Sequence, residues 1–263
     1  MTNTAVNTAQ LAQELETRGF CVARGYLGAA ELALLSEQAE AELARRVEPI
    51  EYEADVGYPG APVSRSAPGG GTPRRLLRAC DRTADFRAFA TSARLGELLL
   101  ATAPWLGPRP QLAQGHHNCV MTKHPGFSSA THWHRDVRYW AFERPRLVSA
   151  WLALTPEGAA NGALSIIPGS HAAEIAESRF DPALFLRPED AQNRALIESA
   201  VALELAPGDL LLFDAQVLHA AGRNDSERTK LSAVFTYHAI DNRPLPGSRS
   251  AALPSLPVAT GGC

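Results

Sequence analysis

Two histidines and an aspartate alternate in the segment THWHRDVRYW, at positions 132, 134 and 136. Side chains alternate between the two faces of a strand, so His134 and Asp136 would project to one side and Arg135 to the other. A His-x-Asp pair offers one nitrogen and one oxygen to a common point. These are two of the three protein ligands of a 2-His-1-carboxylate Fe(II) site, which keeps open positions for dioxygen chemistry.

A third ligand must come from a distant strand, and His219 in GDLLLFDAQVLHAAGRN is the best candidate. It ends an apolar run that opens at the Pro207-Gly208 turn, as expected of a buried strand. A lone His-x-Asp tripeptide is common by chance, so this interpretation depends on the rest of the chain.

The elements that would position these residues fall into two parts of one domain, 1–263. Residues 1–110 are predicted to be mainly helical, with helices over 8–19, 28–46 and 93–107 and a short strand at 20–27. Residues 58–73 are dense in Gly, Pro and Ser and predict a loop, either a connector or a lid. Residues 111–240 contain short apolar runs separated by turn signals, which predicts a β-barrel or jelly roll. The runs are 118–123, 131–140, 146–155, 162–170, 200–205, 208–221 and 230–240.

Composition narrows the partners. The net charge of −3 gives no overall attraction to nucleic acid or to an anionic membrane. The first residues lack the pattern of a secretory signal, and no apolar run reaches the length of a membrane helix, so a cytoplasmic protein is expected. Four scattered cysteines without a C-x-x-C pair predict free thiols; they are Cys21, Cys80, Cys119 and Cys263.

The sequence resembles the phytanoyl-CoA dioxygenase family of Fe(II)- and 2-oxoglutarate-dependent oxygenases. The matching segments are WHRD at 133–136, SAWLALTPEGAANGALSIIPGSH at 149–171 and LAPGDLLLFDAQVLHAAGRND at 205–225, with an amino-terminal RGFCVARGYLGAAELALL. This resemblance implies a double-stranded β-helix, that is, a jelly-roll barrel with flanking helices. It also implies iron held by His134, Asp136 and His219, with 2-oxoglutarate and O2 as cosubstrates and hydroxylation as the reaction.

The family usually anchors the distal carboxylate of 2-oxoglutarate on an arginine eleven residues past the distal histidine. Here that residue is Lys230, which supplies a point charge instead of a bidentate fork. Ser232 shares its face and could donate a second hydrogen bond. Arg228 has the same parity and is the alternative anchor. Trp151 matches a position lining the cosubstrate pocket, although core packing would explain it equally well.

Basic residues gather before and around the iron-binding strand, which favours a small anionic substrate entering beneath the 58–73 loop. The segment 116–140 also resembles the bacterial branch that hydroxylates the acidic sugar Kdo. Acyl-CoA, amino acid derivatives and natural-product intermediates are the alternative substrates. The predicted substrate contacts are Lys123, Arg138, His132 and Asn118, although strand parity puts Lys123 and Asn118 on opposite faces.

Two other functions are compatible with parts of the pattern. His132 extends the motif to H-x-H-x-D, reminiscent of metallo-β-lactamase-type hydrolases, but Val137 stands where that element has a histidine. A barrel that binds a ligand without oxidising it is the non-enzyme alternative, which the intact set of three ligands disfavours. A homo-oligomer is left open.

Overall fold

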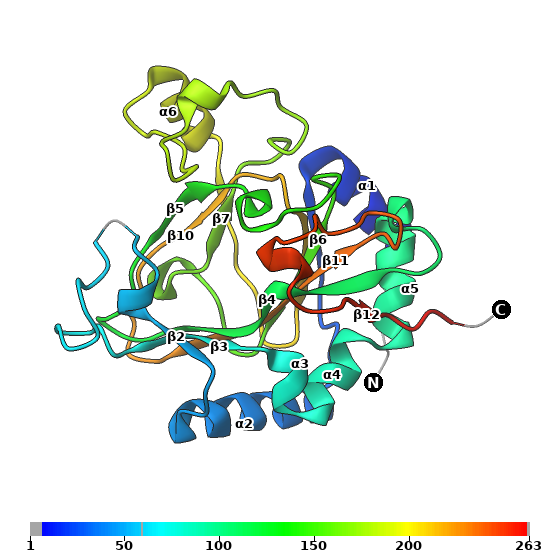
Figure 1. The fold of residues 1–263 in the computed structure, drawn as a ribbon, viewed down its shortest axis with the longest axis horizontal. Helices are drawn as coiled ribbons and strands as arrows, with labels where there is room; N and C mark the ends of the chain where they lie inside the picture. The colour runs from blue at the N-terminus through cyan, green and yellow to red at the C-terminus, as the bar shows by residue number, and fades with distance from the viewer. Residues whose placement is uncertain (1–6, 59, 262–263) are drawn as a thin grey trace.

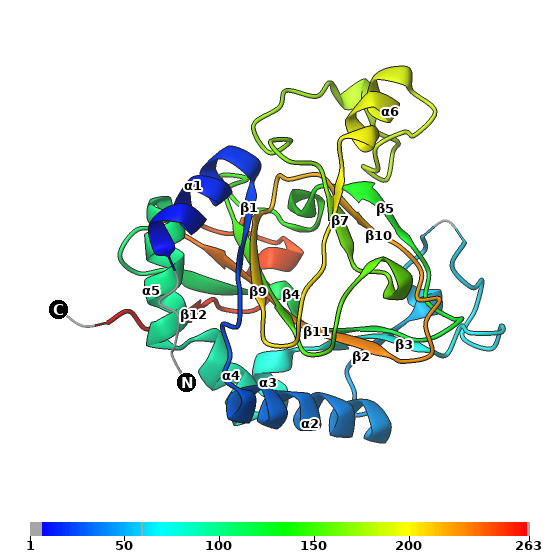
Figure 2. The same cartoon turned by 180° about the vertical axis from the view of Figure 1, so that it is seen from behind.

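The computed structural model describes residues 7–58 and 60–261. Two antiparallel sheets enclose an apolar interior (Figure 1, Figure 2). The larger sheet has the order β1-β9-β6-β11-β4-β3-β2, and β12 also pairs with β4. Its strands are β1 (Phe20–Ala23), β2 (Ile50–Tyr52), β3 (Pro73–Leu77), β4 (Gln111–Lys123), β6 (Val148–Ala153), β9 (Leu210–Asp214), β11 (Lys230–His238) and β12 (Leu256–Pro257).

The smaller sheet has the order β5-β10-β7-β8 and faces the larger one across the interior. Its strands are β5 (Thr131–His134), β10 (His219–Ala221), β7 (Leu164–Ile166) and β8 (Val201–Ala202). The central strand β10 is paired on both sides, to β5 and to β7.

Helices cover the outer face of the larger sheet (Figure 1). They are α1 (Thr8–Arg18), α2 (Ala29–Arg45), α3 (Ala79–Arg82), α4 (Ala84–Ala90) and α5 (Ala93–Thr102). The helix α6 (Ala191–Glu198) instead packs, with its flanking loops, outside the smaller sheet. None of the helices in residues 7–58 and 60–261 combines the length and the apolar character needed to cross a bilayer.

The strand β11 shows how the two faces of the larger sheet differ. Leu231, Ala233 and Phe235 pack against the helices, whereas Val234 joins the core between the sheets. By the two-residue period of a strand, Lys230 and Ser232 share the inner face with Val234. The alternation therefore places two polar residues inside the barrel at one end of β11.

The predicted helices and the series of short strands are present, but several strands differ in extent. The run 118–123 is the end of the longer β4, and β2 and β3 lie in the part predicted to be mainly helical. The run 131–140 is a strand only to His134, after which Asp136–Tyr139 form a 3-10 turn. The run 208–221 is two strands in different sheets, β9 and β10, so His219 begins a strand instead of ending one. Three cysteines, Cys21, Cys80 and Cys119, are buried with free thiols, and Cys263 lies outside the described residues.

Candidate functional site

His134 and His219 lie directly opposite each other on neighbouring strands of the smaller sheet. They are partners in the β5–β10 register, and their ring centroids are 4.3 Å apart. Backbone carbonyls fix both rings: Nδ1 of His134 lies 2.7 Å from the carbonyl oxygen of His132, and Nδ1 of His219 lies 3.1 Å from that of Val217. With Nδ1 donating, Nε2 of each ring keeps its lone pair for a metal.

Asp136 reaches the two histidines from the 3-10 turn that follows β5. Its Oδ1 lies 3.5 Å from Nε2 of His134 and 3.4 Å from Nε2 of His219. One ligand atom from each residue lies within 4.8 Å of the other two, and all three residues are buried. Oδ1 accepts no hydrogen bond from the described residues. A buried carboxylate oxygen left without a donor between two imidazole nitrogens fits a divalent metal.

The second oxygen of Asp136 is held by two other side chains. Nδ1 of His117 lies 3.2 Å from Oδ2, and Oγ of Ser149 lies 3.4 Å from it. Ser149 is itself 3.0 Å from the hydroxyl of Thr236 on β11. The carboxylate is therefore fixed by contacts to the larger sheet while its Oδ1 faces the histidines.

Burial and neighbouring charges shift the pKa values of all three residues, and the shifts of Asp136 and His134 favour their metal-binding forms. Burial alone would raise the pKa of Asp136, but the neighbouring imidazoles of His117 and His219 hold it well below its usual range. Burial, followed by the neighbouring His219, lowers the pKa of His134 to about 4. For His219, burial acts to lower the pKa but is outweighed by Asp136, which raises it. At neutral pH, Asp136 is charged and His134 is neutral.

A cavity opens beside these three residues, inside the barrel. Besides them, residues of β3, β4, β6 and β9 line it, including Arg75, His117, Met121, Lys123, Trp151 and Phe213. Arg75, Met121 and Ser232 are successive partners across β3, β4 and β11, and Lys123 pairs with Lys230 in the next row. The cavity therefore runs from the histidines toward a cationic end of the larger sheet.

Three of the residues predicted to hold 2-oxoglutarate do lie together, but they bind the carboxylate of Glu157, a residue of this chain. Nζ of Lys230 donates to Oε2 of Glu157 at 3.0 Å. The Oγ of Ser232 and the Nε1 of Trp151 donate to Oε1 of the same residue, at 2.6 and 2.8 Å. Trp151 also lines the cavity. Arg228, the alternative anchor, is exposed in the turn before β11.

Lys123 is the lysine that lines the cavity, and its ammonium is bonded differently. Nζ donates to the carbonyl oxygens of Ser129 (3.1 Å) and Gly222. An ammonium has three protons, and the third has no partner among the described residues. Gly162 makes room for this side chain, because a Cβ there would lie 2.9 Å from Cδ of Lys123 and 2.5 Å from the oxygen of Gly222.

The other predicted substrate contacts lie outside the cavity lining. Arg138 stacks its guanidinium 3.9 Å from the ring centroid of Phe185 and donates to the hydroxyl of Tyr139 at 3.2 Å. His132 also packs against Phe185, with centroids 5.7 Å apart. Asn118 is buried on the opposite side of β4, where its Oδ1 accepts from the backbone N–H of Cys80 at 2.9 Å. Arg138 and His132 thus flank the site, and Asn118 does not.

The Gly/Pro/Ser segment reaches this flank through Tyr58. The hydroxyls of Tyr58 and Tyr139 are 2.6 Å apart, and Tyr139 lines the cavity. The Tyr58 ring meets Phe185 edge to face, with centroids 5.4 Å apart. Through Tyr58, the start of the 58–73 segment therefore contacts residues around the cavity.

Sequence reasoning missed the site roles of Glu157, His117, Arg75 and Tyr139. Glu157 sits in TPEGAANG, which has the composition of a turn, and only its position after the Trp151 strand could have suggested it. Arg75 lies on β3, a strand within the part of the chain that was predicted to be mainly helical. His117 shares β4 with Lys123, so its parity was the available signal.

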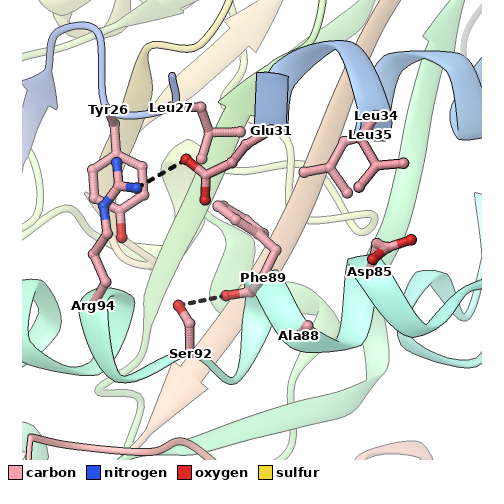
Figure 3. Close-up of a pocket in the computed structure, with 10 residues that line it drawn as sticks. All are labelled: Tyr26, Leu27, Glu31, Leu34, Leu35, Asp85, Ala88, Phe89, Ser92 and Arg94. Atoms are coloured by element: carbon pink, nitrogen blue, oxygen red, sulfur yellow. Dashed lines mark hydrogen bonds and ion pairs between the residues drawn. The ribbon is translucent and has the colours of Figure 1, made fainter. Parts of the chain in front are cut away.

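A second hollow lies on the outer face, between α2 and the α4–α5 region (Figure 3). Its charged side chains Arg94 and Glu31 pair with each other at 3.1 Å, and Oγ of Ser92 donates to the carbonyl of Phe89. Asp85 in its lining accepts from Gln38. Among the described residues this hollow gathers no set of ligand atoms like that around Asp136.

Comparison with known proteins agrees with this site. Residues 15–232 match the family model described as phytanoyl-CoA dioxygenase (PhyH). The chain is 30% identical over 261 residues to the ectoine dioxygenase of Halomonas elongata, covering 90% of this chain and 71% of that protein. It is 25% identical over 261 residues to the ectoine dioxygenase of Sphingopyxis alaskensis, covering 92% and 79%.

Solved structures show the same fold. The structure of EctD from S. alaskensis with 2-oxoglutarate and 5-hydroxyectoine superposes with a TM-score of 0.73 at 23% identity, covering 98% of this chain and 88% of that one. The epimerase SnoN in complex with Fe3+, α-ketoglutarate and nogalamycin RO gives 0.71 at 21% identity, covering 97% and 96%. The predicted jelly-roll architecture is confirmed.

Proposed function

Because this chain belongs to the phytanoyl-CoA dioxygenase family of iron- and 2-oxoglutarate-dependent oxygenases, we propose that it hydroxylates an aliphatic carbon of a small polar molecule at the centre formed by His134, Asp136 and His219. The observation that carries this proposal is the convergence of two Nε2 atoms on Oδ1 of Asp136, a buried oxygen without a hydrogen-bond donor. Two nitrogens and one carboxylate oxygen on neighbouring elements form the ligand set of non-haem Fe(II) oxygenases.

Iron with 2-oxoglutarate and O2 supplies the oxidising power, converting a C–H bond to C–OH with release of succinate and CO2. The residues of the chain orient the metal-binding side chains. The carbonyls of His132 and Val217 keep the imidazoles in one tautomer, and His117 with Ser149 holds Asp136. Trp151 and Phe213 line the cavity with apolar surface, which limits access of water to the reacting atoms.

The distal carboxylate of 2-oxoglutarate extends toward the cationic end of the cavity in this proposal. Of the two lysines there, Lys230 already binds Glu157, whereas Lys123 has a proton without a partner among the described residues. A buried ammonium is costly without an anion, so Lys123 is the better receptor. Lys123, which the sequence suggested as a substrate contact, is thus assigned to the cosubstrate.

The substrate is proposed to be an amino acid derivative or a natural-product intermediate that carries an anionic group. The relatives named above act on ectoine or bind a nogalamycin compound, and none of them is a Kdo hydroxylase, so the acidic-sugar prediction has no support. At the flank of the site, Arg138 donates only to neutral oxygens of the described residues, Tyr139 and Ala183. Its guanidinium beside the Phe185 ring suits a carboxylate attached to a compact apolar body.

The test is a turnover screen that follows succinate released from 2-oxoglutarate in the presence of Fe(II) and O2. Ectoine, N-acylated and cyclic amino acids and polyketide-derived acids are the first panel, each beside its uncharged amide or ester. We expect succinate formation to rise with an anionic member and to fall with its uncharged analogue. Absence of any Fe(II)-dependent succinate, even without substrate, would contradict the oxygenase proposal, and equal use of the uncharged analogues would contradict only the anionic substrate.

A further inference from the structure

Glu157 occupies the place at which the sequence led us to expect a carboxylate of the cosubstrate. Its two oxygens receive the three donors of that subsite, from Lys230, Ser232 and Trp151. The side chains of the ion pair are almost completely buried, with 3% of Lys230 and none of Glu157 exposed. The full donor set for one carboxylate is thus already used inside the protein.

Glu157 is held by its backbone as well as by its side chain. Its N–H donates to the carbonyl of Leu205 at 2.9 Å, and the N–H of Leu205 donates back at 3.0 Å. Moving the carboxylate out would leave Lys230 buried without a partner, which is strongly unfavourable. The pair is therefore fixed in place behind Trp151, which lines the cavity and donates to Glu157.

At this end of the barrel, the cationic side chains outnumber their carboxylate partners by one. Arg74 pairs with Glu53, Arg75 pairs with Glu51, and Lys230 pairs with Glu157. Within residues 7–58 and 60–261, Lys123 has no carboxylate partner and donates only to backbone oxygens. The local excess is a single positive charge, which matches a ligand that brings a single carboxylate to this end.

We propose that Glu157 is a specificity-determining residue, a resident carboxylate that neutralises Lys230 and leaves Lys123 alone to receive the distal carboxylate of the 2-oxo acid. This inference rests on the proposed function. Glu157 sets the charge of the subsite. It thereby sets how much more tightly the protein binds a 2-oxo acid with a distal carboxylate than one without it. Removing its charge would free a second ammonium for the same ligand.

The experiment measures that difference in affinity directly, as the ratio of the dissociation constants of 2-oxopentanoate and 2-oxoglutarate. The two acids have the same chain length and differ in the distal carboxylate. Both are titrated by calorimetry into the full chain loaded with Mn(II), so that no turnover is needed. A ratio cancels general damage to the cavity, and circular dichroism with Mn(II) affinity checks that each variant is folded.

Glu157→Gln keeps the acceptor for Ser232 and Trp151 but frees the charge of Lys230, and we expect the ratio to rise about 10-fold or more, the scale of one charge-assisted hydrogen bond. Lys230→Gln/Glu157→Gln replaces the ion pair by neutral amides and should return the ratio to the wild-type value. Lys123→Met should lower it about 10-fold or more.

An unchanged or lower ratio in Glu157→Gln would overturn the inference. So would a collapse of the ratio in the double variant, because Lys230 would then be the anchor and Glu157 a placeholder that the ligand displaces. Failure of wild-type protein to bind 2-oxoglutarate at all would instead count against the proposed function.

Discussion

Nδ1 of His117 lies 3.2 Å from Oδ2 of Asp136, while the other oxygen of that carboxylate faces the Nε2 atoms of His134 and His219. His117 is on β4 and the histidines are on the smaller sheet, so this contact joins the two sheets at the proposed iron site. A residue that orients a metal-binding carboxylate from behind commonly affects metal affinity without touching the metal.

We therefore predict that His117→Phe weakens metal binding about 10- to 100-fold. His117→Asn, whose amide N–H can donate to Oδ2 of Asp136, should restore most of the loss. The neighbouring His116 stacks on Tyr139 at 4.2 Å, and His116→Phe is the matched control. Affinity is read from Co(II) absorption titrations. Equal losses in the two Phe variants would indicate a packing effect and not a role in orienting Asp136.

Each of three single substitutions should abolish Fe(II)-dependent succinate formation and tight Mn(II) binding: His134→Ala, Asp136→Ala and His219→Ala. Each removes one of three buried ligand atoms, and a site of two ligands holds a divalent ion poorly. His171→Ala is the control, since His171 lies away from the site with Nε2 3.0 Å from the carbonyl of Glu16. Wild-type metal affinity in any of the three would remove that residue from the proposed set.

The proposed metal ligands could be predicted from the sequence because the prediction depends on few assumptions. His134 and Asp136 are two residues apart, and His219 is identified from its apolar run and its family segment. The structure brings the three together although the expected strands end at His134 and break before His219. The cationic end could not be read in the same way. Whether Lys230 meets a ligand or Glu157 depends on how the loop after β6 folds back onto β11, a contact between residues far apart in sequence.

Binding of 2-oxoglutarate should weaken as pH rises through the lowered pKa of Lys123. Burial first, then the charges of Arg74 and Lys230, lower the pKa of Lys123 well below 10.5, while Glu53 and Glu157 oppose the shift. The ammonium form receives the carboxylate, so affinity is full below this lowered pKa and is lost as pH passes through it. Calorimetry on Mn(II)-loaded protein from about pH 7 to about pH 10 measures the effect.

Lys123→Arg is the control for that pH dependence, because a guanidinium stays charged over the whole range. Its affinity for 2-oxoglutarate should vary less with pH than that of the wild type. Identical pH profiles for the two proteins would show that the titration of another group, and not of Lys123, governs binding.

Tyr58→Phe should loosen the segment that closes the flank of the site. The variant loses the 2.6 Å hydroxyl contact to Tyr139 but keeps the ring against Phe185. We expect more succinate per hydroxylated product, because water then reaches the site more easily. Removing residues 60–72 should have a larger effect in the same direction. A product-to-succinate ratio equal to wild type in both variants would make this segment a plain connector.

Arg74→Met should lower the free energy of unfolding by about 3 to 5 kcal/mol, because it leaves Glu53 buried without its partner. Arg74 and Glu53 are 2% and 1% exposed in their side chains, 3.0 Å apart, and Arg74 also donates to the hydroxyls of Ser129 and Thr131. Arg94→Met breaks an exposed pair with Glu31 and should cost about 1 kcal/mol or less. Urea denaturation compares the two, and similar losses would show that the buried pair is not an anchor of the fold.

The burial of the cysteine thiols affects how easily peroxide oxidises this protein. Burial, the largest cause in each case, raises the pKa of Cys21, Cys80 and Cys119 to about 12. At neutral pH the thiolate fraction is then about 1 in 100,000, and it is the thiolate that reacts with peroxide. Cys119 stands in the same core between the sheets as Trp151. Peroxide that escapes from an uncoupled cycle would therefore oxidise these thiols slowly, and we expect damage to begin at the thioether of Met121, which lines the cavity.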